Sequence, residues 1–290
     1  MHRPVASPYW VDPDCPFRVA DQPTGRPDDA PGKKERERRL RELVGRLDHL
    51  QRALYADNRH ALLLIFQAMD AAGKDGTIRA VLSGVNPAGC QVSSFKAPSA
   101  EELDHDFLWR TVRRLPERGR IGVFNRSYYE EVLVVRVHPE FLEGQRLPHP
   151  PDLDKLWQRR FESIREHERH LARNGTVLLK FWLNVSREEQ RERFLGRLDE
   201  PDKNWKFSEG DVKERARWKE YMQAYEEAIA ATSRPWAPWY AIPADSKSFM
   251  RMEVARIVVE TLARLELRFP EVGAERLAEF DGFRERLQGD

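Results

Sequence analysis

Residues 61–77 read ALLLIFQAMDAAGKDGT, an apolar run followed directly by a glycine-containing loop. Ala61 to Met69 has the length and composition of a buried strand, and the loop then opens a helix. Gly73-Lys74 matches the second half of the pattern GxxxxGK[ST], which stands between a strand and a helix. In that pattern backbone N–H groups at the helix N-terminus cradle phosphate oxygens, and the lysine neutralises their charge. The stretch therefore predicts a phosphate-binding loop in an α/β fold.

The loop departs from this pattern at two positions. Ala68 replaces the first glycine, and Asp75 replaces the Ser/Thr whose hydroxyl usually helps to hold Mg²⁺. Asp70 lies inside the loop and offers a hard oxygen ligand in place of that hydroxyl, although capping a helix is the structural alternative for it. We expect catalytic roles for Asp70 and Lys74. The predicted phosphate contacts are Ala71, Ala72, Gly73, Lys74, Asp75, Gly76 and Thr77.

Strand-like and helix-like segments alternate along the rest of the chain. Further strands are predicted at Gln91–Phe95, Arg120–Phe124, Thr176–Val185 and Trp239–Ile242. Helices are predicted at Lys33–Asn58, from Leu153 to Asn174 and at Met250–Leu267, and capping serines are predicted at Ser99, Ser186 and Ser208. This alternation predicts a parallel sheet covered by helices on both faces, which is a three-layer α/β/α sandwich.

The first predicted helix carries a regular leucine stripe. Its leucines are spaced 3-4-3-4 along one face and are Leu40, Leu43, Leu47, Leu50 and Leu54. Two heptads are few for a coiled coil, so we favour packing of this face on the domain over self-association. A contact between copies of the chain stays open as the alternative.

A second motif, IGVFNRSYYEE, ends the third predicted strand. Asn125 stands where phosphate-loop enzymes usually have a carboxylate, and its amide oxygen can ligate Mg²⁺ directly or through water. Glu130 and Glu131 follow within about a turn and could restore the missing charge. Arg126 is placed to grip a phosphate with its guanidinium, although an ion pair with a glutamate is the structural alternative. We expect catalytic roles for Asn125 and Arg126, and metal binding by Asp70, Glu130 or Glu131.

Composition excludes several classes of protein. The chain has 290 residues, of which 40% are hydrophobic, and its 49 Lys+Arg nearly balance 48 Asp+Glu, unlike the net basic domain of a nucleic-acid binder. Its longest apolar stretch, Ala61–Phe66, is far shorter than a membrane span, and no secretory signal is visible. With only two cysteines we expect a cytoplasmic protein. The sequence HERH at 167–170 is one residue short of a zinc motif and fits an amphipathic helix.

Seven blocks together resemble the polyphosphate kinase 2 family: QAMDAAGKDGT, GVNPAG, HDFLWR, FNRSYYEEVLVVRVHP, KFWLNVSREEQ, RLDEPDKNWKFSEGD and APWYAIPADSK. They are similar above all to the class that acts on both nucleoside mono- and diphosphates, which shares the asparagine at position 125. The resemblance implies a P-loop kinase fold with a lid, dependence on Mg²⁺, and assembly as a dimer or tetramer. It also implies a kinase domain at 33–268 with its lid at about 186–221, followed by a tail at 269–290. Residues 1–32 hold seven of the 19 prolines and almost no periodic apolar residues, so we expect them to form an extended or wrapping tail.

The segment that resembles the lid is rich in cations. A mobile basic lid excludes water from phosphates and supplies charge in the transition state. Ion pairs along solvated helices are the alternative for most of these cations. The expected polyphosphate contacts are Arg197, Lys203 and Lys206.

The resemblance implies reversible phosphoryl transfer from inorganic polyphosphate to AMP and ADP, with ATP as product or as donor in reverse. Neither nucleic acid nor a membrane is expected as a partner. Two other hypotheses stay open. One is a nucleoside-monophosphate or small-metabolite kinase that uses only ATP as donor, and the other is a non-enzymatic protein that binds polyanions with its phosphate loop and basic lid.

Overall fold

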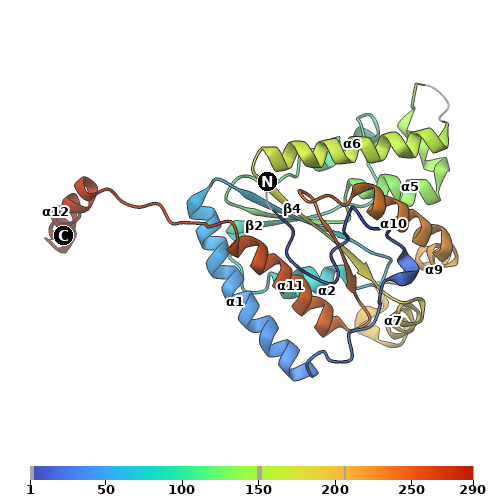
Figure 1. Cartoon of the computed structure of the whole chain (residues 1–290), viewed down its shortest axis with the longest axis horizontal. Coiled ribbons are helices and arrows are strands. Elements are labelled where there is room, and N and C mark those ends of the chain that lie inside the picture. Colours follow the sequence, from blue (N-terminus) through green and yellow to red (C-terminus); the bar gives the residue numbers. More distant parts are fainter. Residues whose placement is uncertain (1–2, 149–151, 206, 290) are drawn as a thin grey trace.

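A five-stranded, all-parallel sheet lies at the centre of the molecule (Figure 1). The structure is a computed structural model that describes residues 3–148, 152–205 and 207–289. The strand order is β2-β3-β1-β4-β5, with β1 (Ala61–Gln67), β2 (Cys90–Ser94), β3 (Ile121–Asn125), β4 (Thr176–Asn184) and β5 (Trp239–Pro243). Each predicted strand is present within two residues of its expected bounds, which confirms the α/β fold with a parallel sheet.

Helices cover both faces of the sheet and complete the predicted three layers (Figure 1). One face carries α1 (Lys33–Asp57), α2 (Lys74–Val81) and α11 (Lys247–Ala263), and the other carries α6 (Leu153–Arg173) and α10 (Trp218–Thr232). The shorter helices and 3₁₀ turns (η) are η1 (Val19–Asp21), η2 (Pro87–Gly89), α3 (Ala100–Leu103), α4 (Trp109–Val112), η3 (Tyr128–Val132), α5 (Val134–Val137), η4 (Pro139–Gln145), α7 (Arg187–Asp199), α8 (Pro201–Asn204) and α9 (Glu209–Ala216). Among the described residues, no helix is long and apolar enough to span a bilayer.

The register of the sheet brings the two sequence motifs together. Strand β1 is buried along its whole length and pairs in parallel with β3 on one side and β4 on the other. Phe66 lies beside Asn125 in this register, so the loop after β1 and the turn after β3 begin side by side. The carboxyl edge of an open parallel sheet, where neighbouring connections diverge, is the usual place for a ligand.

The leucine stripe of α1 faces the interior. Leu47 and Leu54 are completely buried, and Leu40, Leu43 and Leu50 are half-buried against the same core. The helix packs along α11 on one face of the sheet. The predicted packing of this face on the domain is therefore confirmed.

The N-terminal segment packs against the domain, whereas the C-terminal helix does not. The N-terminal segment runs along β5 with Val5 and Tyr9 buried, and Ala241 donates its N–H to the Tyr9 carbonyl oxygen at 2.8 Å. Covering this edge strand blocks further strand pairing there. At the other end α12 (Ala274–Gly289), which was not predicted, lies apart from the rest of the chain (Figure 1).

Two details near helix ends differ from the prediction. Helix α11 ends at Ala263 rather than at Leu267, since Glu266 adopts the left-handed φ of 49° that a helix cannot continue through. Ser208 caps α9 as predicted, but its hydroxyl oxygen accepts from the N–H of Gly210 rather than from Asp211.

Candidate active site

The phosphate loop leaves β1 and turns sharply into α2. Ala71 and Gly73 take positive φ values of 60° and 108°, and a Cβ on Gly73 would come within 3.2 Å of the Met250 side chain. The first N–H groups of α2 have no partner within the helix, and the helix dipole places partial positive charge beside them. The loop therefore has the backbone geometry of an anion site.

Lys74 is the first residue of α2 and folds back over the loop. Its Nζ donates to the carbonyl oxygen of Ala68 at 2.7 Å and to that of Met69 at 3.4 Å. Burial is the main reason that the pKa of Lys74 falls to about 8, and the nearby Arg126 lowers it further. The carboxylates of Asp70 and others oppose this shift, and an incoming phosphate would do the same.

Arg126 stands at the junction of the two motifs. Its backbone adopts φ 64°, which is strained for an arginine, and its N–H donates to the carbonyl oxygen of Phe66 at 3.0 Å. Its guanidinium donates to Asp70 Oδ1 at 2.6 Å and to Glu130 Oε2 at 3.1 Å. Glu130 and, after it, Asp70 raise the pKa of this guanidinium. Arginine has five N–H donors, so these two bonds leave three that a phosphate can use.

Asp75, which replaces the hydroxyl of the phosphate-loop pattern, lies next to Asn125, which replaces the usual carboxylate of the second motif. The Asn125 side-chain amide donates to Asp75 Oδ1 at 2.5 Å. A carboxylate at the loop thus stands beside an amide at the end of β3, the reverse of the usual order. The Asp75 carboxylate therefore supplies a negative charge beside Asn125, where other phosphate-loop enzymes have the carboxylate at the end of the strand.

Glu130 and Glu131 point to different surroundings. Glu130 accepts from Gln67 Nε2 at 2.9 Å and from Arg126, within the candidate reaction centre around Asp70 and Arg126. Glu131 is buried, pairs with Arg160 at 3.0 Å and accepts from Gln145 at 2.8 Å. Burial also raises the pKa of Glu131. Of the two candidates that the sequence left open, the geometry therefore favours Glu130.

Oxygen ligands are available for Mg²⁺, but they do not form a cage. In the described part of the chain, no three acidic, histidine or cysteine side chains come close enough to hold a metal alone. Asp70 and Glu130 are joined through Arg126, and about a quarter to a third of each side chain is exposed. Because Mg²⁺ is usually held by one or two carboxylates together with substrate phosphates and water, this donor set fits it.

The segment predicted as the lid lies over the loop. Two of its side chains, neither of which is among the predicted contacts, donate hydrogen bonds to the backbone of the loop. Arg193 of α7 is nearly buried and donates to the carbonyl oxygens of Ala71 (3.1 Å) and Ala72 (2.6 Å). Gln190 donates to the carbonyl oxygen of Asp70 at 2.9 Å. The periodic spacing of α7 could have pointed to them, since residues 190, 193, 194 and 197 share one helical face.

Of the three predicted polyphosphate contacts, the structure describes the side chain of Arg197 alone. Arg197 pairs with Asp211 at 3.0 Å and lines the cavity at the loop. Burial and then Asp70 raise the pKa of Asp211, which places this lid carboxyl near the reaction centre. Lys203 lies in α8, and nothing is described of its side chain. Lys206 lies outside the described residues.

Two cavities meet at the reaction centre. The first, of about 630 Å³, has largely apolar and aromatic walls that include Phe107, Phe141, Tyr221 and Tyr225. The second, of about 600 Å³, lies over the phosphate loop and is lined by Lys74, Asp75, Gly76, Arg193, Arg197, Lys247 and Arg251 together with several carboxylates. Of the residues that the structure describes, Asp70 and Arg126 alone line both.

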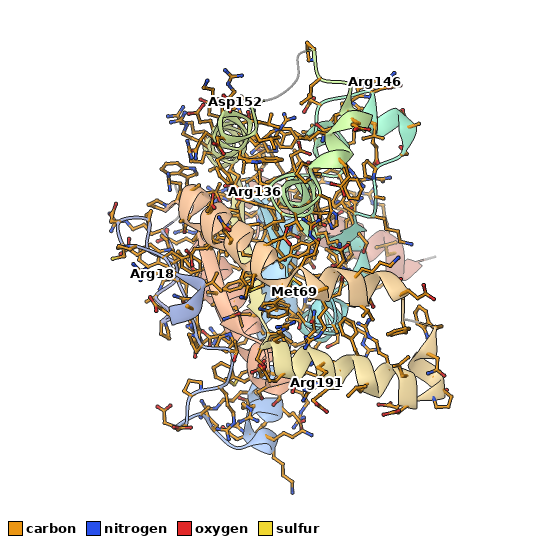
Figure 2. All side chains as sticks on the ribbon, turned by 90° about the vertical axis from the view of Figure 1, so that its right-hand side faces the viewer. Arg18, Met69, Arg136, Arg146, Asp152 and Arg191 are labelled. Carbon is orange, nitrogen blue, oxygen red and sulfur yellow. The ribbon has the colours of Figure 1, made fainter. Side chains whose placement is uncertain are left out.

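The sticks in Figure 2 give the position of this centre in the whole molecule. Met69 of the phosphate loop lies near the middle of that view, between Arg146 above it and Arg191 of α7 below it. The first cavity is also lined by the segment just before Arg146, and the second by α7. The candidate reaction centre therefore lies between the η4 region and α7.

Comparison with known proteins places the chain in a family. The sequence model of the polyphosphate kinase 2 family matches residues 31–270. A relative from Rhodopseudomonas palustris, named ADP-polyphosphate phosphotransferase, is 58% identical over 249 residues, or 86% of each chain. An AMP/ADP-polyphosphate phosphotransferase from Meiothermus ruber is 46% identical over 267 residues, which are 91% of this chain and 95% of that one. The crystal structure of polyphosphate kinase 2 from Arthrobacter aurescens superimposes with a TM-score of 0.87 at 37% identity, over 96% of this chain and 95% of the other. This chain belongs to the polyphosphate kinase 2 family.

Proposed function

We propose that this protein transfers the terminal phosphoryl group of inorganic polyphosphate to ADP and to AMP, reversibly and with Mg²⁺. One observation carries the proposal: two cavities of different chemistry meet at Asp70 and Arg126. The names of the relatives from Rhodopseudomonas palustris and Meiothermus ruber support the same donor and the same acceptors.

The two cavities suit two different substrates. The cavity over the phosphate loop has no aromatic residue in its described lining, so it offers cations and backbone N–H groups but no surface on which a base could stack. That composition suits a polyphosphate chain. The other cavity offers Phe107, Phe141, Tyr221 and Tyr225, which suit the base and ribose of a nucleotide. The nucleotide would then present its terminal phosphate towards Arg126.

The chain's own groups position and neutralise rather than react. The N–H groups of the loop and Lys74 hold the terminal phosphoryl group of the donor, and Arg126 orients the acceptor phosphate in line with it. An oxygen of the acceptor phosphate then forms a bond to the donor's terminal phosphorus. The bridging P–O bond breaks, and its electron pair leaves on the shortened polyphosphate. A lid held by Arg193 keeps water out.

Asp70 and Glu130 would hold Mg²⁺, and Asp75 adds a third carboxylate on the donor side. The ion would neutralise charge on the transferring phosphoryl group. Arg126 bridges Asp70 and Glu130, so it fixes both carboxylates before any ion binds.

Two further proposals concern the setting of the enzyme. Both cysteines are free, which supports a reducing cytoplasm. The exposed apolar side chains of Leu277, Phe280 and Leu287 on α12 support assembly as a homodimer or tetramer.

The deciding experiment supplies purified protein with Mg²⁺ and polyphosphate, adds AMP or ADP in separate reactions, and follows ADP and ATP by chromatography. We expect both acceptors to be phosphorylated, and the Lys74→Ala variant to lose about a thousandfold in rate. Transfer from ATP alone would identify an ordinary nucleotide kinase instead. Binding of polyphosphate without any transfer would identify a polyanion-binding protein.

A further inference from the structure

A closed network of polar side chains lies in the core behind the reaction centre. Glu168 of α6, Lys180 of β4 and Thr232 of α10 are completely buried. The ammonium of Lys180 donates to Glu168 Oε2 at 2.6 Å, to the Tyr129 hydroxyl at 2.9 Å and to the Thr232 carbonyl oxygen at 2.9 Å. Glu168 Oε1 accepts from the hydroxyls of Tyr128 at 3.0 Å and Tyr129 at 2.9 Å. All three ammonium hydrogens and both carboxylate oxygens therefore have partners.

Stability alone does not account for such a pair. A buried ion pair usually contributes no more than well-packed apolar side chains of similar volume, because removing two charges from water is costly. Lys180 also interrupts the middle of an otherwise apolar strand that pairs with β1 on one side and with β5 on the other. What the network does supply is a fixed place for the two tyrosine hydroxyls.

Those tyrosines lie in the chain between the two functional side chains. Tyr128 and Tyr129 separate Arg126 and Ser127 from Glu130. The turn is held on one side by the bond from the Arg126 N–H to Phe66, and the Ser127 hydroxyl accepts from the N–H of Tyr129 at 3.1 Å. On its other side the turn is held by the hydrogen bond from the Tyr129 hydroxyl to Glu168.

We propose that Glu168, Lys180 and Tyr129 are positioning residues, which hold Arg126 and Glu130 in the geometry that phosphoryl transfer needs. This inference rests on the proposed function. Arg126 sits in a strained backbone conformation, and such a conformation persists only where its surroundings fix it. The same network ties down the end of α10, whose Tyr225 lines the first cavity.

The test removes one hydroxyl and leaves the ring in place. Tyr129→Phe should lower kcat by about tenfold or more, since a small misplacement at a reaction centre has effects of this size. Its binding of polyphosphate alone, measured by calorimetry, should stay within twofold, because the phosphate loop is untouched. Replacing Glu168 and Lys180 together, as Glu168→Gln with Lys180→Met, should shift kcat in the same direction without leaving a lone buried charge.

A matched control separates position from stability. Tyr240 of β5 is as deeply buried as Tyr129, and its hydroxyl bonds the backbone of Val5 on the far side of the core. Tyr240→Phe should lower the melting temperature by a similar amount as Tyr129→Phe and keep the wild-type kcat. Equal losses of kcat in the two variants would overturn the proposal.

A double-mutant cycle gives the decisive readout. If Tyr129 acts through Arg126 and Glu130, adding Tyr129→Phe to the variant Arg126→Lys/Glu130→Gln should change kcat by less than about twofold, whereas independent effects would multiply. Multiplying effects, or a wild-type kcat in Tyr129→Phe, would refute the positioning role. Should Tyr129→Phe fail to fold, Tyr128→Phe, which also loses a bond to Glu168, takes its place in the cycle. A wild-type chain without any transfer activity would refute the proposed function instead, which is a separate outcome.

Discussion

Titration of Lys74 offers a sharp test of the reaction centre. Burial lowers the pKa of this lysine to about 8 in the free protein, so it is about nine-tenths protonated at pH 7 and about one-tenth at pH 9. Only the cation can neutralise a phosphate, so kcat/KM for polyphosphate should fall about tenfold between these two pH values. Bound phosphate favours the cation and raises its pKa, so kcat should hold to a higher pH than kcat/KM does.

The assay is a set of initial rates from pH 7 to 10 at constant Mg²⁺ and ionic strength. Lys74→Arg serves as the comparison, since a guanidinium does not titrate in this range, and its residual rate should show no inflection near pH 8. Lys180 also has a pKa of about 8, lowered by burial, so the Glu168→Gln/Lys180→Met variant should keep the inflection. A flat wild-type profile, or the same inflection in Lys74→Arg, would refute the reasoning.

Unfolding does not explain such a loss. The pKa of Lys74 is lower in the folded protein than its ordinary 10.5, so the unfolded chain binds more protons between about pH 8 and 10.5. Stability from this group therefore rises with pH across that window, while activity falls. A thermal melt at pH 9 separates the two effects.

Three other predictions follow from named contacts. Asp70→Asn should raise the Mg²⁺ concentration for half-maximal rate by about tenfold, because carboxylate charge dominates binding of hard cations, and an unchanged Mg²⁺ titration would assign Asp70 to structure. Glu130→Gln should lower kcat strongly, because this carboxylate contacts Arg126. Glu131→Gln breaks a buried pair and should mainly lower the free energy of unfolding, by about 3 kcal/mol. The reverse pattern would contradict the placing of Glu130 rather than Glu131 at the reaction centre. Leu54→Ala should lower the free energy of unfolding by about 2–5 kcal/mol in urea titrations, and a loss below 1 kcal/mol would mean that α1 is loosely packed.

Local chemistry explains which parts of the molecule the sequence could predict. Four of the strands could be found because a parallel sheet buried on both faces leaves continuous apolar runs, such as Ala61 to Phe66. Strand β2 lies at the edge of the sheet, is partly exposed and has no such run. The phosphate loop was found because its glycine and lysine stand at a fixed place after such a strand. Both signals lie within about ten residues of chain, and neither needs knowledge of a distant partner.

The missed features all depend on partners far along the chain. In the sequence, Glu168 belongs to the polar run HERH, which is typical of an exposed helix face, and Lys180 is the single charged residue of an apolar strand. Only the packing of α6 on β4 makes them a pair. In the sequence, Arg193 is one of many cations in the predicted lid, and only the fold shows that it bonds the carbonyl oxygens of the phosphate loop. The spacing of α7 shows which helical face Arg193 shares, but it does not show which distant group that face contacts.

The meeting of two cavities at Asp70 and Arg126 also bears on the order of events during turnover. In the proposed assignment donor and acceptor occupy separate cavities and can be bound at the same time, so we expect sequential kinetics without a phosphorylated enzyme. A nucleotide can then leave its chamber while the shortened polymer remains over the loop. The next acceptor would meet a donor already in place, so one long chain can be consumed over several turnovers before it dissociates.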